Sequence, residues 1–276
     1  MKPLSWLGGL ACLPGTALLI LFGFGAGILS CAQVVSEESV LSESLPSKTW
    51  TVGEFVGILS QRIEDFRSLR ALATVNYSGP DGRAGFQEAV IVHRPDRLRL
   101  ETLSPLGVIL IVTADADELA GFHTREGLFY RGRSSKQNLL YYTQIPLELR
   151  EITALLMGLP PVSLQPGWEG EGNSLYRDVA GGRREKVAFH VSLGVPASWE
   201  RSGQDGTPEL SAQFSDYSAT TAGPFPHKIV LEARAPKLRL EIRYQEPEVN
   251  VSLPSGLFVQ QKPGNAKEIP LESLGG

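Results

Sequence analysis

The stretch from Lys237 to Tyr244 reads Lys-Leu-Arg-Leu-Glu-Ile-Arg-Tyr. Its apolar side chains occupy every second position and charged ones stand between them. This is the period of an extended strand, in which successive side chains point to opposite faces. One face is therefore apolar and the other is charged. We expect a strand of an antiparallel sheet that packs on a core with one face and meets water with the other.

The same signals recur along the chain. Arg97–Glu101 alternates as cleanly, and Gly79-Pro80-Asp81-Gly82 predicts a tight turn. Val108–Thr113 is apolar on both faces, so it lies centrally in the sheet or faces apolar groups on each side. The other predicted strands are Ala71–Tyr77, Phe86–Val92, Leu119–Phe122, Leu128–Arg131, Val187–Leu193, Leu210–Phe214 and Ile229–Ala233.

Two segments have helical periodicity instead. Thr51 and Glu54 have the spacing of a capping box, and apolar residues recur at helical intervals between Val52 and Leu69. The opposite side of this first helix carries Gln61, Arg62, Glu64 and Asp65. A second helix is predicted from Pro146 to Met157. Two helices cannot cover so many strands as a separate layer. We therefore predict an α+β fold: a single antiparallel, strongly curved, half-open β-barrel with a helical lid.

The N-terminal segment differs from the rest. No charged residue occurs from Pro3 to Ser36, which indicates either a cleaved export signal or a transmembrane helix. Ile28-Leu29-Ser30-Cys31 favours the signal, because it resembles the lipobox of bacterial lipoproteins. We expect residues 1–30 to be a lipoprotein signal peptide and Cys31 to carry palmitate or similar acyl chains. The alternative is a retained membrane helix with an incidental cysteine.

The sequence after Cys31 and the balance of acidic and basic residues indicate where the protein is located and which partners it lacks. Residues 31–49 are predicted to be the lipidated cysteine and a flexible linker, and residues 50–276 the folded domain. No Asp follows Cys31, which implies sorting to the outer membrane if the enterobacterial rule applies. The chain has 30 acidic and 26 basic residues, a poor balance for nucleic acid. Membrane contact is therefore expected through the lipid anchor, on the side that faces the periplasm.

Signatures of catalysis are missing. The sequence contains neither a Gly-x-Ser-x-Gly elbow nor a Gly-Lys-Ser/Thr phosphate loop, and its only cysteines are Cys12 and Cys31. Asp115, Asp117 and Glu118 are better explained by a solvated turn than by a Ca²⁺ site. The histidines have no metal-ligand spacing; they are His93, His123, His190 and His227. We expect no enzyme activity, no cofactor and no metal.

Several short motifs resemble the LolA/LolB family of bacterial lipoprotein-localisation factors, and LolB, the outer-membrane acceptor, in particular. Arg97–Glu101 runs into Ser104-Pro105-Leu106-Gly107 and then an apolar strand. Later come Pro146–Arg150 with Leu155–Pro160, and a weaker match at Pro224-Phe225-Pro226. The resemblance spans roughly residues 55–258. The chain is longer than LolB at residues 168–184 and 199–208, which puts strict equivalence in doubt.

The resemblance implies a fold, a ligand and a site. The fold would be a half-barrel with a lid, and the cargo acylated lipoproteins, delivered by a periplasmic LolA-type carrier. Leu106 would correspond to the leucine of LolB that inserts into the membrane, although it could also fold back under its loop. Apolar strand positions would line the cavity or simply pack together. They are Val90, Val92, Leu98, Leu100, Leu110, Val112, Phe189, Val191, Leu238, Leu240 and Ile242.

Three functions therefore stay open. The first is a LolB-like outer-membrane lipoprotein that binds acyl chains, or another hydrophobic ligand, and helps insert its cargo. The second is a non-catalytic structural or scaffolding envelope lipoprotein with the same fold. The third is an inner-membrane-tethered sensor, which requires that residues 1–30 are retained.

Overall fold

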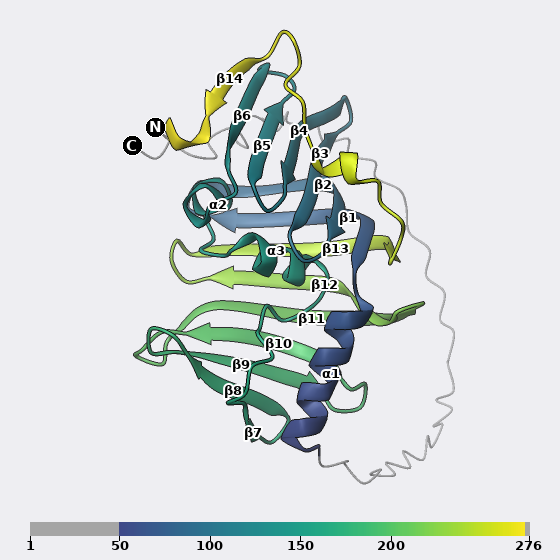
Figure 1. Cartoon of the computed structure of the whole chain (residues 1–276), viewed down its shortest axis with the longest axis vertical. Helices are drawn as coiled ribbons and strands as arrows, with labels where there is room; N and C mark the ends of the chain where they lie inside the picture. The colour runs from purple at the N-terminus through teal and green to yellow at the C-terminus, as the bar shows by residue number, and fades with distance from the viewer. Residues whose placement is uncertain (1–49, 274–276) are drawn as a thin grey trace, which may run out of the picture.

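A computed structural model describes residues 50–273, and Figure 1 shows its architecture. The strands form one sheet in the order β14-β6-β5-β4-β3-β2-β1-β13-β12-β11-β10-β9-β8-β7. Their bounds are β1 Ser68–Gly79, β2 Gly82–His93, β3 Arg97–Ser104, β4 Gly107–Ala114, β5 Glu118–His123, β6 Leu128–Arg133, β7 Glu169–Glu171, β8 Ser174–Val179, β9 Arg183–His190, β10 Val195–Ser202, β11 Pro208–Thr220, β12 Gly223–Ala233, β13 Leu238–Val249 and β14 Lys267–Pro270.

The sheet is curved and open. Its two end strands, β14 and β7, pair only with β6 and β8, so the sheet does not close into a barrel. Strands β3 to β6 stand steeply across the direction of β8 to β13 in Figure 1, which shows the strong twist. The predicted curved, antiparallel, non-closed sheet is confirmed. One pair departs from it, because β14 runs parallel to β6.

The chain path places β1 in the middle of the sheet. Hairpins build outward from β1 to β6, and two helices then carry the chain back to the opposite edge. From β7 the strands return in order until β13 pairs with β1, with Ile242 opposite Val75. The concave side is therefore enclosed by two half-sheets that meet at the β1–β13 pair.

Helix α1, Val52–Asp65, forms as predicted at its N-terminus. The Oγ1 atom of Thr51 accepts a hydrogen bond from the N–H of Glu54 at 3.2 Å, and the Glu54 carboxylate accepts from the N–H of Thr51 at 2.8 Å. The helix ends before Leu69, because Ser68 already begins β1. Arg62 was predicted on the solvent-exposed side of this helix, and this prediction is wrong. It is only 6% exposed, and its Nη1 donates to the carbonyl of Pro224 on β12.

Residues 50–273 contain three α-helices where two were predicted. Helix α3 spans Leu149–Leu156, within the predicted segment, whereas α2, Lys136–Thr143, was missed. The apolar residues of α2 are adjacent in the sequence and do not repeat along one face, so periodicity could not predict this helix. The available signal was a cap, since the hydroxyl of Ser135 accepts from the N–H of Asn138 at 3.2 Å. Two 3₁₀ turns, Ser255–Phe258 and Leu271–Ser273, lie in the C-terminal segment.

One edge of the sheet was also missed. Residues 168–184 and 199–208, where the chain is longer than LolB, contain β7, β8 and the end of β10. The predicted strand Val187–Leu193 is wrong at its end, because β9 stops at His190. Val191 lies in the turn before Gly194, whose φ is +60°. The Val191 side chain is therefore half-buried beside a turn rather than on the strand.

Gly158, just after α3, occupies a position that only glycine fits. Its φ is +68°, and an added Cβ would lie 2.4 Å from Cγ of Pro226. We expect Gly158→Ala to lower the free energy of unfolding by about 2–4 kcal/mol, because backbone strain and overpacking add. Gly57→Ala is the matched control, since that helical position has open space. Urea unfolding measures both; equal stability of the two variants would contradict this packing.

Candidate binding site on the concave face

Most of the predicted cavity residues come together in one hydrophobic cluster on the concave side. Val90, Val92, Leu98, Val112, Phe189, Leu238 and Ile242 are buried in it, and Leu100, Leu110 and Leu240 pack against it half-buried. Val191 is the exception, because it lies in the β9–β10 turn. The sheet thus provides a continuous apolar face that runs through both half-sheets.

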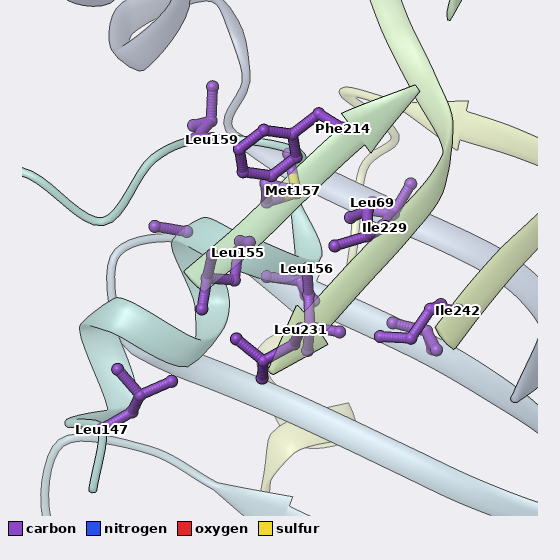
Figure 2. Packing of buried hydrophobic residues seen from close by; sticks show 14 of the residues in the cluster. Leu69, Leu147, Leu155, Leu156, Met157, Leu159, Phe214, Ile229, Leu231 and Ile242 are labelled. Carbon is purple, nitrogen blue, oxygen red and sulfur yellow. The ribbon is translucent and has the colours of Figure 1, made fainter. Parts of the chain in front are cut away.

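Side chains of α3 and of the segment after it fill the space above this face. In Figure 2, Leu156 lies next to Leu231 of β12, and both belong to the same buried cluster as Leu155 and Met157. Met157 is fully buried and Leu155 is nearly so. In this arrangement the protein's own side chains occupy the volume that a hydrocarbon chain would take. The lid is therefore closed.

Three polar contacts hold α3 across the concave side. Glu151 forms an ion pair with Arg201 of β10 at 2.5 Å. The hydroxyl of Thr153 donates to the carbonyl of Pro95, in the β2–β3 turn, at 2.5 Å. The hydroxyl of Tyr244 on β13 donates to the carbonyl of Leu156 at 2.9 Å. Because β2 and β10 belong to different half-sheets, α3 acts as a strut between them.

The contact at Glu151 belongs to a buried ionic cluster, which we call the arginine cluster and which consists of Arg177, Glu185, Arg201 and Glu151. Glu185 is shared by both guanidinium groups, with Arg177 at 2.9 Å and Arg201 at 3.0 Å. Exposure of the four side chains ranges only from 4% for Glu185 to 19% for Glu151. Sequence reasoning missed this cluster, because two of its members lie on strands that were not predicted.

A buried carboxyl group lies on the other half-sheet. Glu88 of β2 is 7% exposed, and its carboxylate accepts a hydrogen bond from the hydroxyl of Thr102 at 3.0 Å. It pairs in register with Ala73 on one side and Thr102 on the other, in the same alternation as Val90. Burial raises the pKa of Glu88 to about 7, although the Thr102 hydrogen bond acts in the opposite direction.

Two pockets lie away from the apolar face. A pocket of about 480 Å³ is bordered by Asn76, Gly85 and Arg239, on the outer side of β1, β2 and β13. The other, of about 420 Å³, lies between the end of α1 and Asn250. Charged side chains border both pockets: Arg83, Arg239 and Glu241 border the first, and Glu64, Asp65 and Arg67 border the second.

The Leu106 loop connects β3 and β4, and its leucine points outward. Leu106 is 90% exposed, so it does not fold back under the loop. The turn is braced by Ser104, whose hydroxyl accepts from the N–H of Leu106 at 3.2 Å and donates to the carbonyl of Gly107 at 2.9 Å. Arg125 of the neighbouring β5–β6 turn donates to the same hydroxyl at 3.2 Å. A firm turn thus presents one bare leucine to the surroundings.

The predicted turn at Asp115 is present between β4 and β5. Asp115 accepts hydrogen bonds from the N–H groups of Asp117 and Glu118, both at 2.9 Å, as a β4–β5 turn requires. Among residues 50–273, no group of three or more metal-ligating side chains comes together.

Within the same part of the chain, every helix is too short or too polar to cross a bilayer. Cys31 and residues 1–49 lie outside the described residues, so the lipid anchor stays a prediction.

Comparison with known proteins relates the fold to several solved structures. A domain from Vibrio parahaemolyticus, provisionally assigned to outer membrane lipoprotein sorting, is 11% identical, with a TM-score of 0.50 over 74% of this chain and 95% of its own. A DUF1329 family protein from Desulfovibrio piger is 10% identical, with a TM-score of 0.51 over 75% of this chain and 97% of its own. A LolA superfamily protein from Nitrosomonas europaea is 13% identical, with a TM-score of 0.49 over 74% and 96%.

Two of these comparisons support the architecture. The neighbours with TM-scores of 0.50 and 0.51, which are 11% and 10% identical respectively, share the fold of this chain. No family model matches the sequence, and no curated protein matches it. The class defined here is therefore a fold class: an open, curved sheet with helices over its concave face.

Proposed function

We propose that this protein is a non-catalytic envelope lipoprotein that binds acyl chains on its concave face when α3 moves aside. The observation that carries the proposal is the apolar face itself, which spans both half-sheets. The eight-residue helix α3 covers its middle part, and Phe55 and Leu59 of α1 cover another part. The Vibrio neighbour, assigned to lipoprotein sorting, has the same fold. Each CH₂ group moved from water to such a face contributes about 0.8 kcal/mol, so one acyl chain can offset the contacts that hold the lid.

Opening the lid is a necessary step in this function. Leaving the sheet would break the three polar contacts of α3 and expose Leu155 and Leu156. An incoming acyl chain would replace these leucines on the same strands, so the apolar face would stay covered. Exchange of one apolar group for another costs little. The polar contacts therefore set the energy of opening.

We further propose that the Leu106 loop delivers cargo to the outer membrane, with Cys31 as the lipid anchor and a LolA-type carrier as donor. The 18 residues from Ala32 to Thr49 can span at most about 60 Å, which lets the domain turn its loop toward the bilayer. One buried leucine contributes about 1.5–3 kcal/mol, which is enough for transient insertion but not for anchoring.

Leu106→Glu tests this role. We expect the variant to lose transfer of an acylated lipopeptide into acceptor vesicles by at least about tenfold, because a charge cannot enter the hydrocarbon layer. Binding of the lipopeptide should be unchanged. Leu193→Glu is the matched control, since Leu193 is also exposed, at 56%, on a different turn. Unchanged transfer in Leu106→Glu, or an equal loss in Leu193→Glu, would remove the loop from the mechanism.

The second candidate is a scaffolding lipoprotein that holds no ligand. The filled concave side favours it, because the protein's own side chains already cover the apolar face. The two functions differ in one observable. If the protein binds acyl chains, adding a long-chain lipid moves α3 aside, and the backbone amide hydrogens of α3 then exchange faster. If the protein is a scaffold, these amide hydrogens stay protected at every lipid concentration.

A further inference from the structure

The arginine cluster carries more positive charge than the sheet alone neutralises. Arg177 and Arg201 share the single carboxylate of Glu185, and all three side chains come from the sheet. The fourth member, Glu151, comes from the lid. When α3 moves aside, two guanidinium groups and one carboxylate remain, with one unit of surplus positive charge at the border of an apolar face.

Each guanidinium of the cluster also lies over the ring of a tryptophan. The guanidinium of Arg177 lies 4.7 Å from the ring centroid of Trp168, and that of Arg201 lies 5.0 Å from the ring centroid of Trp199. The indole N–H groups of both tryptophans are buried and donate no hydrogen bond. Because each guanidinium lies over a ring whereas an indole N–H lies in the ring plane, these are cation–π contacts, and they hold the two guanidinium groups in place beside the apolar face.

Apolar side chains adjoin the cluster on the same strands. Trp199 is next but one to Arg201 on β10, and Val187 is next but one to Glu185 on β9, and both are fully buried in the concave cluster. An anion held by Arg201 would therefore have the apolar face directly beside it. This juxtaposition matches a molecule with a charged head and a hydrocarbon tail, and it fits a free inorganic ion poorly.

We infer that Arg201 and Arg177 form a binding site for the anionic head group of an amphiphile, and that Glu151 occupies this site while α3 is closed. The inference rests on the proposed function, whose ligand class it narrows. Glu151 serves two structures at once: its Oε1 accepts from Arg201 at 2.5 Å, and its Oε2 accepts from the N–H of Glu148 at 2.8 Å, at the start of α3. An entering phosphate or carboxylate head takes the place of Oε1 and frees the lid.

Glu151→Gln separates these two roles. Glutamine still accepts at the helix start but removes the charge from the arginine site. The full chain is extracted in a neutral detergent, and non-covalently bound lipid is quantified by mass spectrometry against the membrane of origin. We expect the variant to retain about tenfold more lipid than the unmodified protein, with phosphatidylglycerol enriched over phosphatidylethanolamine.

The double variant Glu151→Gln with Arg201→Gln is the control. It leaves Arg177 and Glu185 as a neutral pair, so it should bind lipid without preference for the anionic head. Two results would overturn the head-group site but leave acyl binding intact. In the first, the lipid bound to Glu151→Gln has the same composition as the membrane of origin. In the second, the double variant prefers anionic lipids as strongly as Glu151→Gln does. Absence of lipid from every variant would end both. Stabilisation of Glu151→Gln by millimolar inorganic phosphate as strong as that by a phosphate lipid would assign the site to a free anion instead.

Discussion

Glu185→Gln is expected to lower the free energy of unfolding by about 3–5 kcal/mol, because it leaves a buried guanidinium without its carboxylate. Glu185 is 3% exposed and binds both Arg177 and Arg201. Loss of its charge leaves Arg201 paired with Glu151 but Arg177 with no carboxylate partner in the cluster. Guanidine or urea unfolding of the full chain, followed by tryptophan fluorescence, measures the change.

Two further variants distinguish burial from ion pairing as such. Asp178→Asn breaks the ion pair between Asp178 and Arg184, whose side chains are 73% and 56% exposed respectively. Because solvent screens this pair, the variant should have almost unchanged stability. The double variant Arg177→Met with Glu185→Met removes one positive and one negative charge together, so it should recover most of the stability that Glu185→Gln loses. If Glu185→Gln unfolds no more easily than Asp178→Asn, the cluster does not support the sheet as described.

Glu88→Gln is expected to change how stability depends on pH. The pKa of Glu88 is raised from 4.5 to about 7 by burial, so the folded state keeps a proton that the unfolded chain loses above about pH 4.5. The stabilisation is fully present below pH 4.5 and is lost as the pH rises through 7. The raised pKa corresponds to about 3 kcal/mol between those limits. Glutamine, which does not titrate, should remove this loss.

Urea unfolding at pH 4.5 and pH 8 measures the effect as a difference between variant and unmodified protein, so that other titrating groups cancel. The difference should favour Glu88→Gln progressively toward pH 8. Glu248→Gln serves as control, because Glu248 is half-exposed and pairs with Arg70 at the surface. A difference that is the same at both pH values would show that Glu88 is ionised in the folded protein as readily as in water.

The sequence predicted the parts of the fold that follow from local periodicity. The alternation at residues 238–244 appears in the structure within β13, and the capping box at Thr51 appears at the start of α1. Failures occurred where tertiary contacts replace local pattern. Arg62 was assigned to solvent, yet it is buried against Phe66 and Tyr217, with its guanidinium carbon 4.6 Å and 5.9 Å from their ring centroids.

The candidate site was predicted only in part for a similar reason. Apolar strand positions such as Val90 and Ile242 identified the concave face, because one side of each strand had to be buried. Charged residues at the same alternating positions, such as Glu88 and Arg201, could not be told from solvent-facing ones, since period alone does not say which face is covered. Whether the face is open or filled depends on where α3 packs, which is a tertiary fact.

Crosslinking with a photoreactive fatty acid tests the central claim most directly. The full chain is irradiated with a palmitate analogue that carries a diazirine near its terminal methyl group, and labelled peptides are mapped by mass spectrometry. Entry of hydrocarbon beneath α3 predicts labels on concave residues such as Val90, Leu98 and Ile242, and displacement of the label by unlabelled palmitate. Labels confined to exposed positions such as Leu106 and Val259, or not displaced by palmitate, would contradict an acyl-binding concave face.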